Sequence, residues 1–198
     1  LVDCGIASEP VREAWEQLFA EGLDGLPILR LLCTHSHPDH IGMADTLHRR
    51  FDAPLWISQG EYMTARVLTS ITPEKDGESQ VAHYRRHGVV DEEQLDALRA
   101  RGRTYFRSLV PSVPEWFHRI RGGERIRIGE RTFRLIPGAG HSAEHIALYT
   151  EDGGQPILIS GDMVLPRIST NVSVFEIEPE ANPLDWYLES LRAYEDCA

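Results

Sequence analysis

Apolar and polar positions alternate along this chain in a way that predicts a mixed α/β protein. Short apolar runs bounded by turn residues, and runs that alternate with period two, indicate strands. Apolar residues at helical spacing indicate helices. The predicted strands are 28–33, 54–58, 124–128, 132–136, 146–149 and 156–160. The predicted helices are 10–22, 38–51 and 183–194. Gly129 and Glu130 form the expected hairpin turn between two of these strands.

The pattern changes between about 59 and 121, where charged, amphipathic helices replace the strands. Gly88, Gly102 and Pro111 are among the residues that break this segment into separate helices. A segment of this length is too long to be an unstructured loop in a compact domain. We therefore expect one domain over 1–198, with a helical insertion at about 59–121.

The composition is that of an ordinary globular domain, with 198 residues, 41% hydrophobic and 26% charged. Lys and Arg number 20 against 31 Asp and Glu, and the resulting formal charge of −11 disfavours nucleic acid as a partner. Arginines in the middle of the chain could still form a local basic groove, although a solvated helical face explains them more simply. They are Arg85, Arg86, Arg99, Arg101, Arg103, Arg107, Arg119 and Arg121.

Cysteine usage favours a reducing compartment, and we expect a cytoplasmic protein. Cys4, Cys33 and Cys197 are widely spaced and form no CxxC pair. Cys33 falls in a predicted strand, where it should pack as a small apolar residue. No apolar run approaches about 18 residues, so no membrane span is expected. The chain starts at Leu1, on what resembles the end of a strand, which predicts that the natural amino terminus is missing.

Three loops rich in His and Asp each follow a predicted strand. The segment 35–40, His-Ser-His-Pro-Asp-His, follows the strand at 28–33. His141 and His145 come after the strand at 132–136, and Asp162 comes after the strand at 156–160. Imidazole and carboxylate together suit zinc and its first-row neighbours. Because open α/β sheets carry their chemistry at the carboxyl ends of strands, the sequence predicts a metal site there.

The order and spacing of these elements resemble the metallo-β-lactamase superfamily. The matching elements are His35-x-His37-x-Asp39-His40, Gly140-His141 and Gly161-Asp162. The resemblance covers nearly the whole chain, from Cys4-Gly5 to Asp162. It implies an α/β fold, the four-layer αββα sandwich, with a metal site at the edges of the two sheets.

The resemblance also implies a ligand set for two divalent ions, zinc in the first place, with iron or manganese as alternatives. His35, His37 and His141 would hold one ion. Asp39 and His40 would hold the second, and Asp162 would bridge both.

Two further residues are expected to support these ligands. Val2-Asp3-Cys4-Gly5 resembles the early Asp-Thr-Gly turn of the family, with Cys in place of Thr, and this makes Asp3 a support for a ligating imidazole. His145 is expected to be a structural residue beside the site.

The implied reaction is metal-assisted hydrolysis. A water between two ions about 3.5–4 Å apart ionises near neutral pH, and the hydroxide attacks an electrophilic carbonyl or phosphorus. Asp39 would orient this nucleophile or pass its proton to the leaving group. The HxHxDH element resembles the branch of glyoxalase II and the lactonases, so the expected substrate is a small thioester, ester or lactone.

Three alternatives stay open. A phosphodiesterase or nuclease of the same superfamily would need a basic groove from the arginines. A catalytically silent binding module is favoured by the absence of a His after His145, since the family normally places a last His on the second ion. Either the chain stops before that His, which is the outcome that we expect, or the second site is a variant. An iron pair would instead resemble the redox branch, with flavodiiron proteins and persulfide dioxygenases.

The helical insertion offers candidate substrate contacts. His83, Tyr84 and His87 would contact a small-molecule substrate if the insertion forms a lid, whereas His83 and His87 alone could bind a metal. The oligomeric state stays open, a homodimer included.

Overall fold

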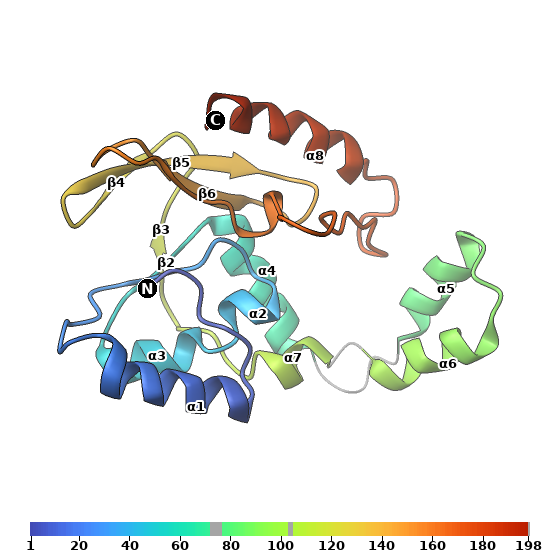
Figure 1. Ribbon diagram of the computed structural model, residues 1–198. Coiled ribbons are helices and arrows are strands. Elements are labelled where there is room, and N and C mark those ends of the chain that lie inside the picture. The colour runs from blue at the N-terminus through green and yellow to red at the C-terminus, as the bar shows by residue number, and fades with distance from the viewer. Residues whose placement is uncertain (72–76, 103–104, 198) are drawn as a thin grey trace.

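Two β-sheets lie face to face, and helices cover both outer faces, in a computed structural model that describes residues 1–71, 77–102 and 105–197 (Figure 1). Arg103 lies outside these ranges. The first sheet has the order β1 (Leu31–Leu32), β2 (Leu55–Ile57), β3 (His118–Arg119). The second has the order β4 (Arg125–Ile128), β5 (Arg131–Gly138), β6 (His145–Thr150), β7 (Ile157–Ile159). The first sheet is parallel and the second is antiparallel.

The helices fall into two groups along the chain. Those of the first half are α1 (Glu9–Gln17), α2 (Pro38–Ile41), α3 (Ala44–Phe51), α4 (Gln59–Ser70), α5 (Glu78–Arg86), α6 (Glu92–Arg101) and α7 (Tyr105–Leu109). The helix α8 (Pro183–Leu191) lies near the carboxyl end, followed by the 3-10 turn η3 (Arg192–Cys197). Two short turns, the π-helical η1 (Leu18–Gly22) and the 3-10 turn η2 (Gly161–Met163), complete the elements. None of the helices in the described part of the chain combines the length and apolar character that a membrane span requires.

Alternation along the strands divides the interior into three apolar clusters. Leu31, Leu55 and Ile57 pack against the helices of the first half of the chain. Leu32 points the other way and packs between the sheets, because successive side chains of a strand face opposite sides.

The second sheet alternates in the same manner. Leu135 and Leu148 face the first sheet, whereas Ile136 and Tyr149 pack against η3, on the face of the sheet that α8 covers (Figure 1). Three interfaces separate four layers, so the predicted αββα sandwich is confirmed.

The predicted helix 38–51 is wrong in one respect, because it is two helices. The break falls at Gly42, where a Cβ atom would lie 2.5 Å from the carbonyl of Pro38 and 2.8 Å from that of Gly5. The N–H of Met43 donates to the carbonyl of Gly5 rather than continuing α2. Close approach of the amino-terminal loop therefore ends α2 and starts α3 in a new direction.

The segment 59–121 contains the helices α4 to α7, but its carboxyl end belongs to a sheet. His118 and Arg119 form β3, which pairs in parallel with β2, so the predicted helical range extends too far. Both residues are exposed and polar, so the sequence shows no apolar pattern that would predict a strand there. Within the range, α4 packs into the core through Tyr62 and Ala65. The helices α5 and α6 instead form a pair that projects from the body of the molecule (Figure 1).

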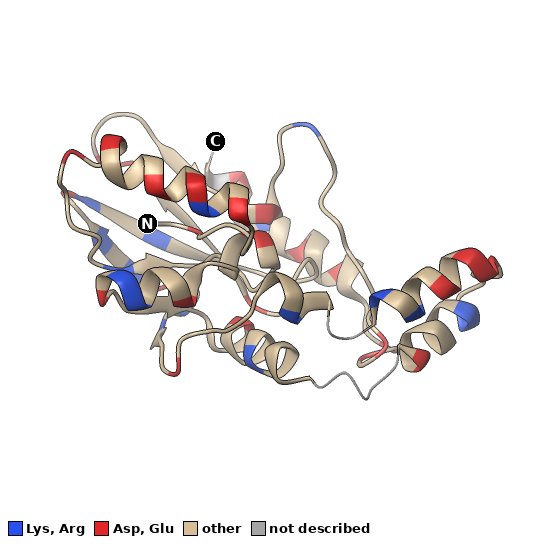
Figure 2. Cartoon of the chain, turned by 90° about the horizontal axis from the view of Figure 1, so that it is seen from below, with Lys and Arg blue, Asp and Glu red and all other residues tan. Residues whose placement is uncertain are grey.

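Basic and acidic residues are interspersed along the helices (Figure 2). Several of the mid-chain arginines pair with carboxylates. These pairs are Arg85 with Glu92, Arg99 with Glu78 and Asp96, and Arg121 with Glu124. Exposed pairs of this kind contribute little to stability, but they neutralise part of the basic character that a nucleic-acid groove would need.

Two of the cysteines are core residues. Cys33 is completely buried, as the sequence predicts, and so is Cys4. Their sulfur atoms lie 3.9 Å apart and both thiols are free.

The packing between the sheets generates a first prediction. Leu148→Ala should lower the free energy of unfolding by about 2–5 kcal/mol, because it leaves a cavity between two sheets that cannot fully close. Leu29→Ala makes the same truncation at a side chain that is 71% exposed, and it should change stability by much less. Denaturant unfolding of both variants provides the comparison. Equal losses would mean that Leu148 is not at the interface.

Candidate metal centre

The loops that follow β1, β5 and β7 meet at one edge of the sandwich. The carbonyl of Thr34, just beyond β1, accepts a hydrogen bond of 2.9 Å from the N–H of Ile146 in β6. This bond joins the first sheet to the second beside the histidine loops. Residues from both sheets therefore contribute to one site.

The first group of converging side chains is His35, His37, His141 and Asp162. Nε2 of His35 lies 3.0 Å from Nδ1 of His37 and 3.1 Å from Nε2 of His141. One carboxylate oxygen of Asp162, Oδ2, lies 3.4 Å from Nε2 of His141. One donor atom from each residue falls within 4.8 Å of the others, so this group could hold a metal ion.

A second group, Asp39, His40 and Asp162, meets the same criterion. Nε2 of His40 lies 3.3 Å from Oδ1 of Asp162 and 3.6 Å from Oδ2 of Asp39. Asp162 therefore turns one oxygen toward each group. The structure brings together all six residues that the resemblance assigns as ligands, in the two groups that it implies.

The hydrogen bonds of the outer ring nitrogens test whether a cation fits the first group. Nδ1 of His141 lies 2.8 Å from the carbonyl of Asn171 and must donate to it. The hydroxyl of Thr34 donates to Asp3 and accepts from Nδ1 of His35 at 3.0 Å. Both Nε2 atoms are then left with bare lone pairs that face each other, an assignment that follows from the hydrogen-bond network. Two such lone pairs at 3.1 Å repel unless a cation lies between them, so the residues fit a divalent ion.

Burial keeps the imidazoles of His35 and His37 neutral. Desolvation, reinforced by the neighbouring imidazoles, lowers the pKa of His35 far below its ordinary value. Burial and His141 likewise lower the pKa of His37. A neutral imidazole is the form that binds a metal.

His40 has a different environment. Burial disfavours its charged form, but the hydrogen bond to Asp3 and the charges of Asp3, Asp162 and Asp39 outweigh it and raise the pKa of His40. The same carboxylates that stabilise a positive charge on His40 would also stabilise a metal cation at this position.

Asp3 supports both groups. Its backbone has φ of +56°, in the left-handed region, and its carboxylate accepts hydrogen bonds from the N–H and hydroxyl of Thr34 and from Nδ1 of His40 at 2.9 Å. One carboxylate thus fixes the ring of His40 directly and that of His35 through Thr34.

His145 contacts the loop that carries Asp162. It is completely buried, and burial, with smaller effects from the neighbouring imidazoles, lowers its pKa to about 3. Its Nε2 accepts the N–H of Asp162 at 3.3 Å. Gly161, with φ of +49°, lies directly against this ring, where a Cβ atom would come within 2.3 Å of Nε2.

The sequence did not point to three further residues at the site. The side chain of Glu61 reaches the backbone of both histidine loops. The hydroxyl of Thr170 donates to the carbonyl of Asp162 at 2.7 Å, and the carbonyl of Asn171 holds His141. A backbone carbonyl has no sequence signature, and an acidic residue early in a charged helix resembles a solvated one.

The structure does not bring His83, Tyr84 and His87 to these groups. They lie on α5, in the projecting pair of helices (Figure 1). Nε2 of His83 lies 3.1 Å from the carbonyl of Val174, and its ring centroid is 4.5 Å from that of His87. Their contact with a substrate stays a prediction.

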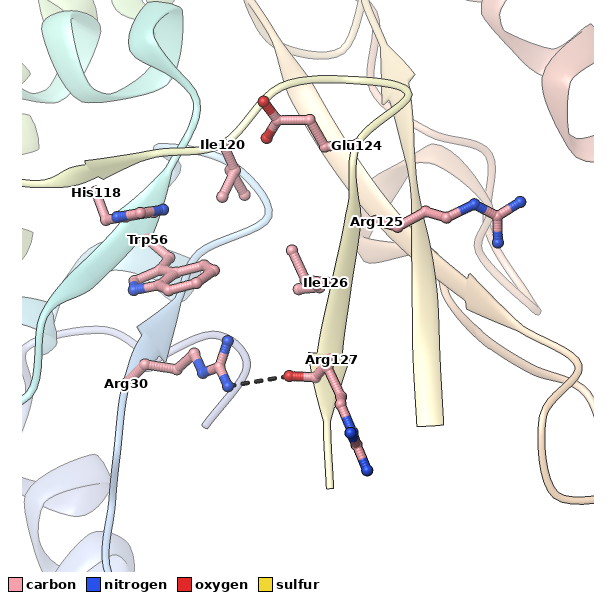
Figure 3. A pocket seen from close by; sticks show the side chains of 8 residues that line it. All are labelled: Arg30, Trp56, His118, Ile120, Glu124, Arg125, Ile126 and Arg127. Carbon is pink, nitrogen blue, oxygen red and sulfur yellow. Dashed lines mark hydrogen bonds between the residues drawn. The ribbon is translucent and has the colours of Figure 1, made fainter. Parts of the chain in front are cut away.

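A separate groove of about 380 Å³ lies between the sheets, beside the amino-terminal end of β1 (Figure 3). Trp56 lies on one wall of the groove, with the guanidinium of Arg30 4.5 Å from its ring centroid and the ring of His118 stacked on it at 4.0 Å between centroids (Figure 3). The groove contains none of the six converging residues, so it is not the metal centre.

The fold and the site together define a two-sheet α/β protein with two groups of potential metal ligands at one edge of the sandwich. The profile described as the metallo-beta-lactamase superfamily matches residues 1–196. The chain belongs to that superfamily.

Individual relatives agree with this assignment. The chain is 50% identical to a beta-lactamase domain protein from Burkholderia ambifaria, with a TM-score of 0.88 over 100% of this chain and 54% of that one. A metallo-beta-lactamase family protein from Thermus thermophilus is 25% identical, with a TM-score of 0.68 over 99% of this chain and 60% of the other. Probable metallo-hydrolase YflN of Bacillus subtilis (strain 168) is 27% identical over 83% of this chain. The match spans 55% of the length of YflN, so about half of that relative lies beyond it.

The role of Asp3 generates a second prediction. Asp3→Asn should weaken zinc binding about 10–100-fold, which is typical when an outer partner of a ligating histidine is changed. Asn tolerates the left-handed backbone, so the change acts on the hydrogen bonds and not on the turn. Asp24→Asn is the matched control, since Asp24 also has positive φ but is exposed. Competition with a chromophoric chelator measures both affinities, and equal affinities would remove Asp3 from the site.

Proposed function

We propose that this protein is a metal-dependent hydrolase with a two-ion centre, and that it cleaves a small thioester, ester or lactone. The observation that carries the proposal is Asp162, whose two oxygens face two separate groups of donors. Membership of the superfamily and the likeness to a metallo-hydrolase support it.

The residues have distinct roles in this proposal. His35, His37 and His141 would hold one ion, Asp39 and His40 the other, with Asp162 between them. When bound, divalent ions polarise the scissile carbonyl and lower the pKa of a nucleophilic water. Imidazole and carboxylate donors suit zinc best, and they also accept iron or manganese.

Asp39 is the residue suited to moving protons. Its side chain is 68% exposed, whereas that of His35 is 0% exposed and that of His141 only 4%. An exposed carboxylate at the rim can reach both solvent and a bound substrate. We therefore assign it to orienting the nucleophile and transferring a proton to the leaving group.

A catalytically silent binding module is the competing hypothesis. It corresponds to the interpretation in which the second site is a variant that lacks the last His of the family. A phosphodiesterase or nuclease has less support, because several of the mid-chain arginines pair with carboxylates.

Metal analysis separates these hypotheses and provides a third prediction. The full-length gene product should hold about two divalent ions per chain, and chelation should remove both its metal and its activity. Asp162→Ala should reduce the content to one ion or fewer, because both groups lose a donor. Elemental analysis after gel filtration makes the measurement. A protein that is isolated without metal and does not bind added zinc would favour the silent binding module.

A fourth prediction concerns the reaction. The metal-loaded full-length protein should hydrolyse a member of a panel of thioesters and lactones in preference to bis-p-nitrophenyl phosphate. Asp39→Ala should lower kcat about 10²–10⁴-fold, the usual contribution of a positioned proton-transfer group.

Asp96→Ala serves as the control for that variant, because Asp96 is a similarly exposed helical aspartate on the projecting pair. It should leave kcat unchanged. Turnover that survives in Asp39→Ala would contradict the assigned role, and preference for the phosphodiester would favour the nuclease hypothesis.

A further inference from the structure

Glu61 is a completely buried carboxylate for which the proposed reaction has no use. It lies in the first turn of α4, between the two histidine loops. Burying a charged group is unfavourable unless hydrogen bonds compensate for the lost hydration. Its partners therefore indicate what it does.

Both oxygens of Glu61 accept backbone hydrogen bonds, one from each loop. Oε2 accepts the N–H of Ser36 at 2.8 Å, and Oε1 accepts the N–H of Glu144 at 2.6 Å. Ser36 lies between His35 and His37, and Glu144 lies in the segment between His141 and His145. One rigid carboxylate thus joins the loop of the first sheet to the loop of the second.

Glu144 in turn accepts hydrogen bonds from the amino-terminal end of α4. Its Oε2 accepts the N–H of Gly60 at 2.7 Å, and its carbonyl accepts the hydroxyl of Ser58 at 2.6 Å. Ser58 is the N-cap of α4, and its side chain makes no cap bond of its own. The carboxylate of Glu144 satisfies a free N–H at this helix end, where a negative charge is favourable.

The backbone of Gly60 packs closely against the side chain of Glu144. A Cβ atom on Gly60 would lie 2.9 Å from Cβ of Glu144 and 3.1 Å from its Oε2. The absence of a side chain at position 60 is what allows the two segments to approach so closely.

We propose that Glu61 and Glu144 act as positioning residues that set the distance between the two histidine loops, so that His35 and His37 meet His141 around one ion. The inference rests on the proposed metal-dependent function. A purely structural role would be served as well by apolar side chains, which avoid the cost of a buried charge. Apolar contacts do not fix the separation of two particular N–H groups, and a carboxylate that accepts from both does.

The test is metal affinity in Glu61→Gln and Glu144→Ala variants of the full-length protein. Both oxygens of Glu61 accept backbone N–H groups, so Glu61→Gln turns an NH₂ group toward one of them, loses one hydrogen bond and places two donors together. The side chain of Glu144 accepts through Oε2, a bond that the amide oxygen of Gln could replace, so Glu144→Ala is the variant that removes it. Each variant should bind zinc about 10–100-fold more weakly, as expected for residues that orient ligands. The visible spectrum of the cobalt-substituted protein should change in position or intensity, because the ligand geometry changes.

Two controls separate positioning from general damage. Glu93→Gln makes the same change at an exposed residue in the first turn of α6, and it should leave zinc affinity and the cobalt spectrum unchanged. Leu148→Ala destabilises the fold without removing a side chain that hydrogen-bonds to either histidine loop, and it should also leave the cobalt spectrum unchanged.

Each outcome decides a different question. A wild-type protein that binds neither zinc nor cobalt overturns the proposed function itself. If the wild type binds and the Glu61→Gln and Glu144→Ala variants bind equally tightly with unaltered spectra, the function stands and the positioning role is wrong. If Glu61→Gln does not fold, the half-buried Glu144 still provides the test, because its substitution disturbs the same contact from the surface side.

Discussion

The site depends on the convergence of three imidazoles on one point. His35 and His141 turn their Nε2 atoms toward each other at 3.1 Å, an arrangement that a shared cation makes favourable. Burial opposes protonation of His35, because it lowers the pKa of this residue far below its ordinary value. Other polar contacts near the site keep the converging side chains in place.

These contacts come from separate parts of the chain and act on separate ligands. Asp3, in the amino-terminal turn, holds His40 directly and His35 through Thr34. Glu61, on α4, accepts hydrogen bonds from the backbone of both histidine loops, at Ser36 and at Glu144. The carbonyl of Asn171 holds His141. The helical layer and both sheets therefore contribute to the site, which explains why a long stretch of chain is needed to build it.

The side chains that meet at the site could be predicted from the sequence, because each follows a strand and is of a type that binds metals. The strand pattern predicts a mixed α/β chain, and the four-layer arrangement came from the family resemblance; in the structure, alternation along β5 and β6 assigns their apolar residues to the two faces of the sheet. Other features depend on contacts that no local pattern records. The break at Gly42 arises from the approach of Gly5, β3 consists of two exposed polar residues, and Glu61 resembles a solvated acid until both loops are in place. Sequence patterns report periodicity and chemistry, and they do not report which distant backbone groups come close.

The hydrogen bond from Ile146 to Thr34 has a consequence for how the sandwich opens. It lies where the two sheets meet, and the donor groups on either side of it come from different sheets, His35 and His37 from one and His141 and Asp162 from the other. An ion held by all four would link the two sheets. Because a ligand that binds only the native state stabilises it in proportion to the logarithm of its free concentration, the melting temperature of the sandwich would follow the metal supply of its surroundings.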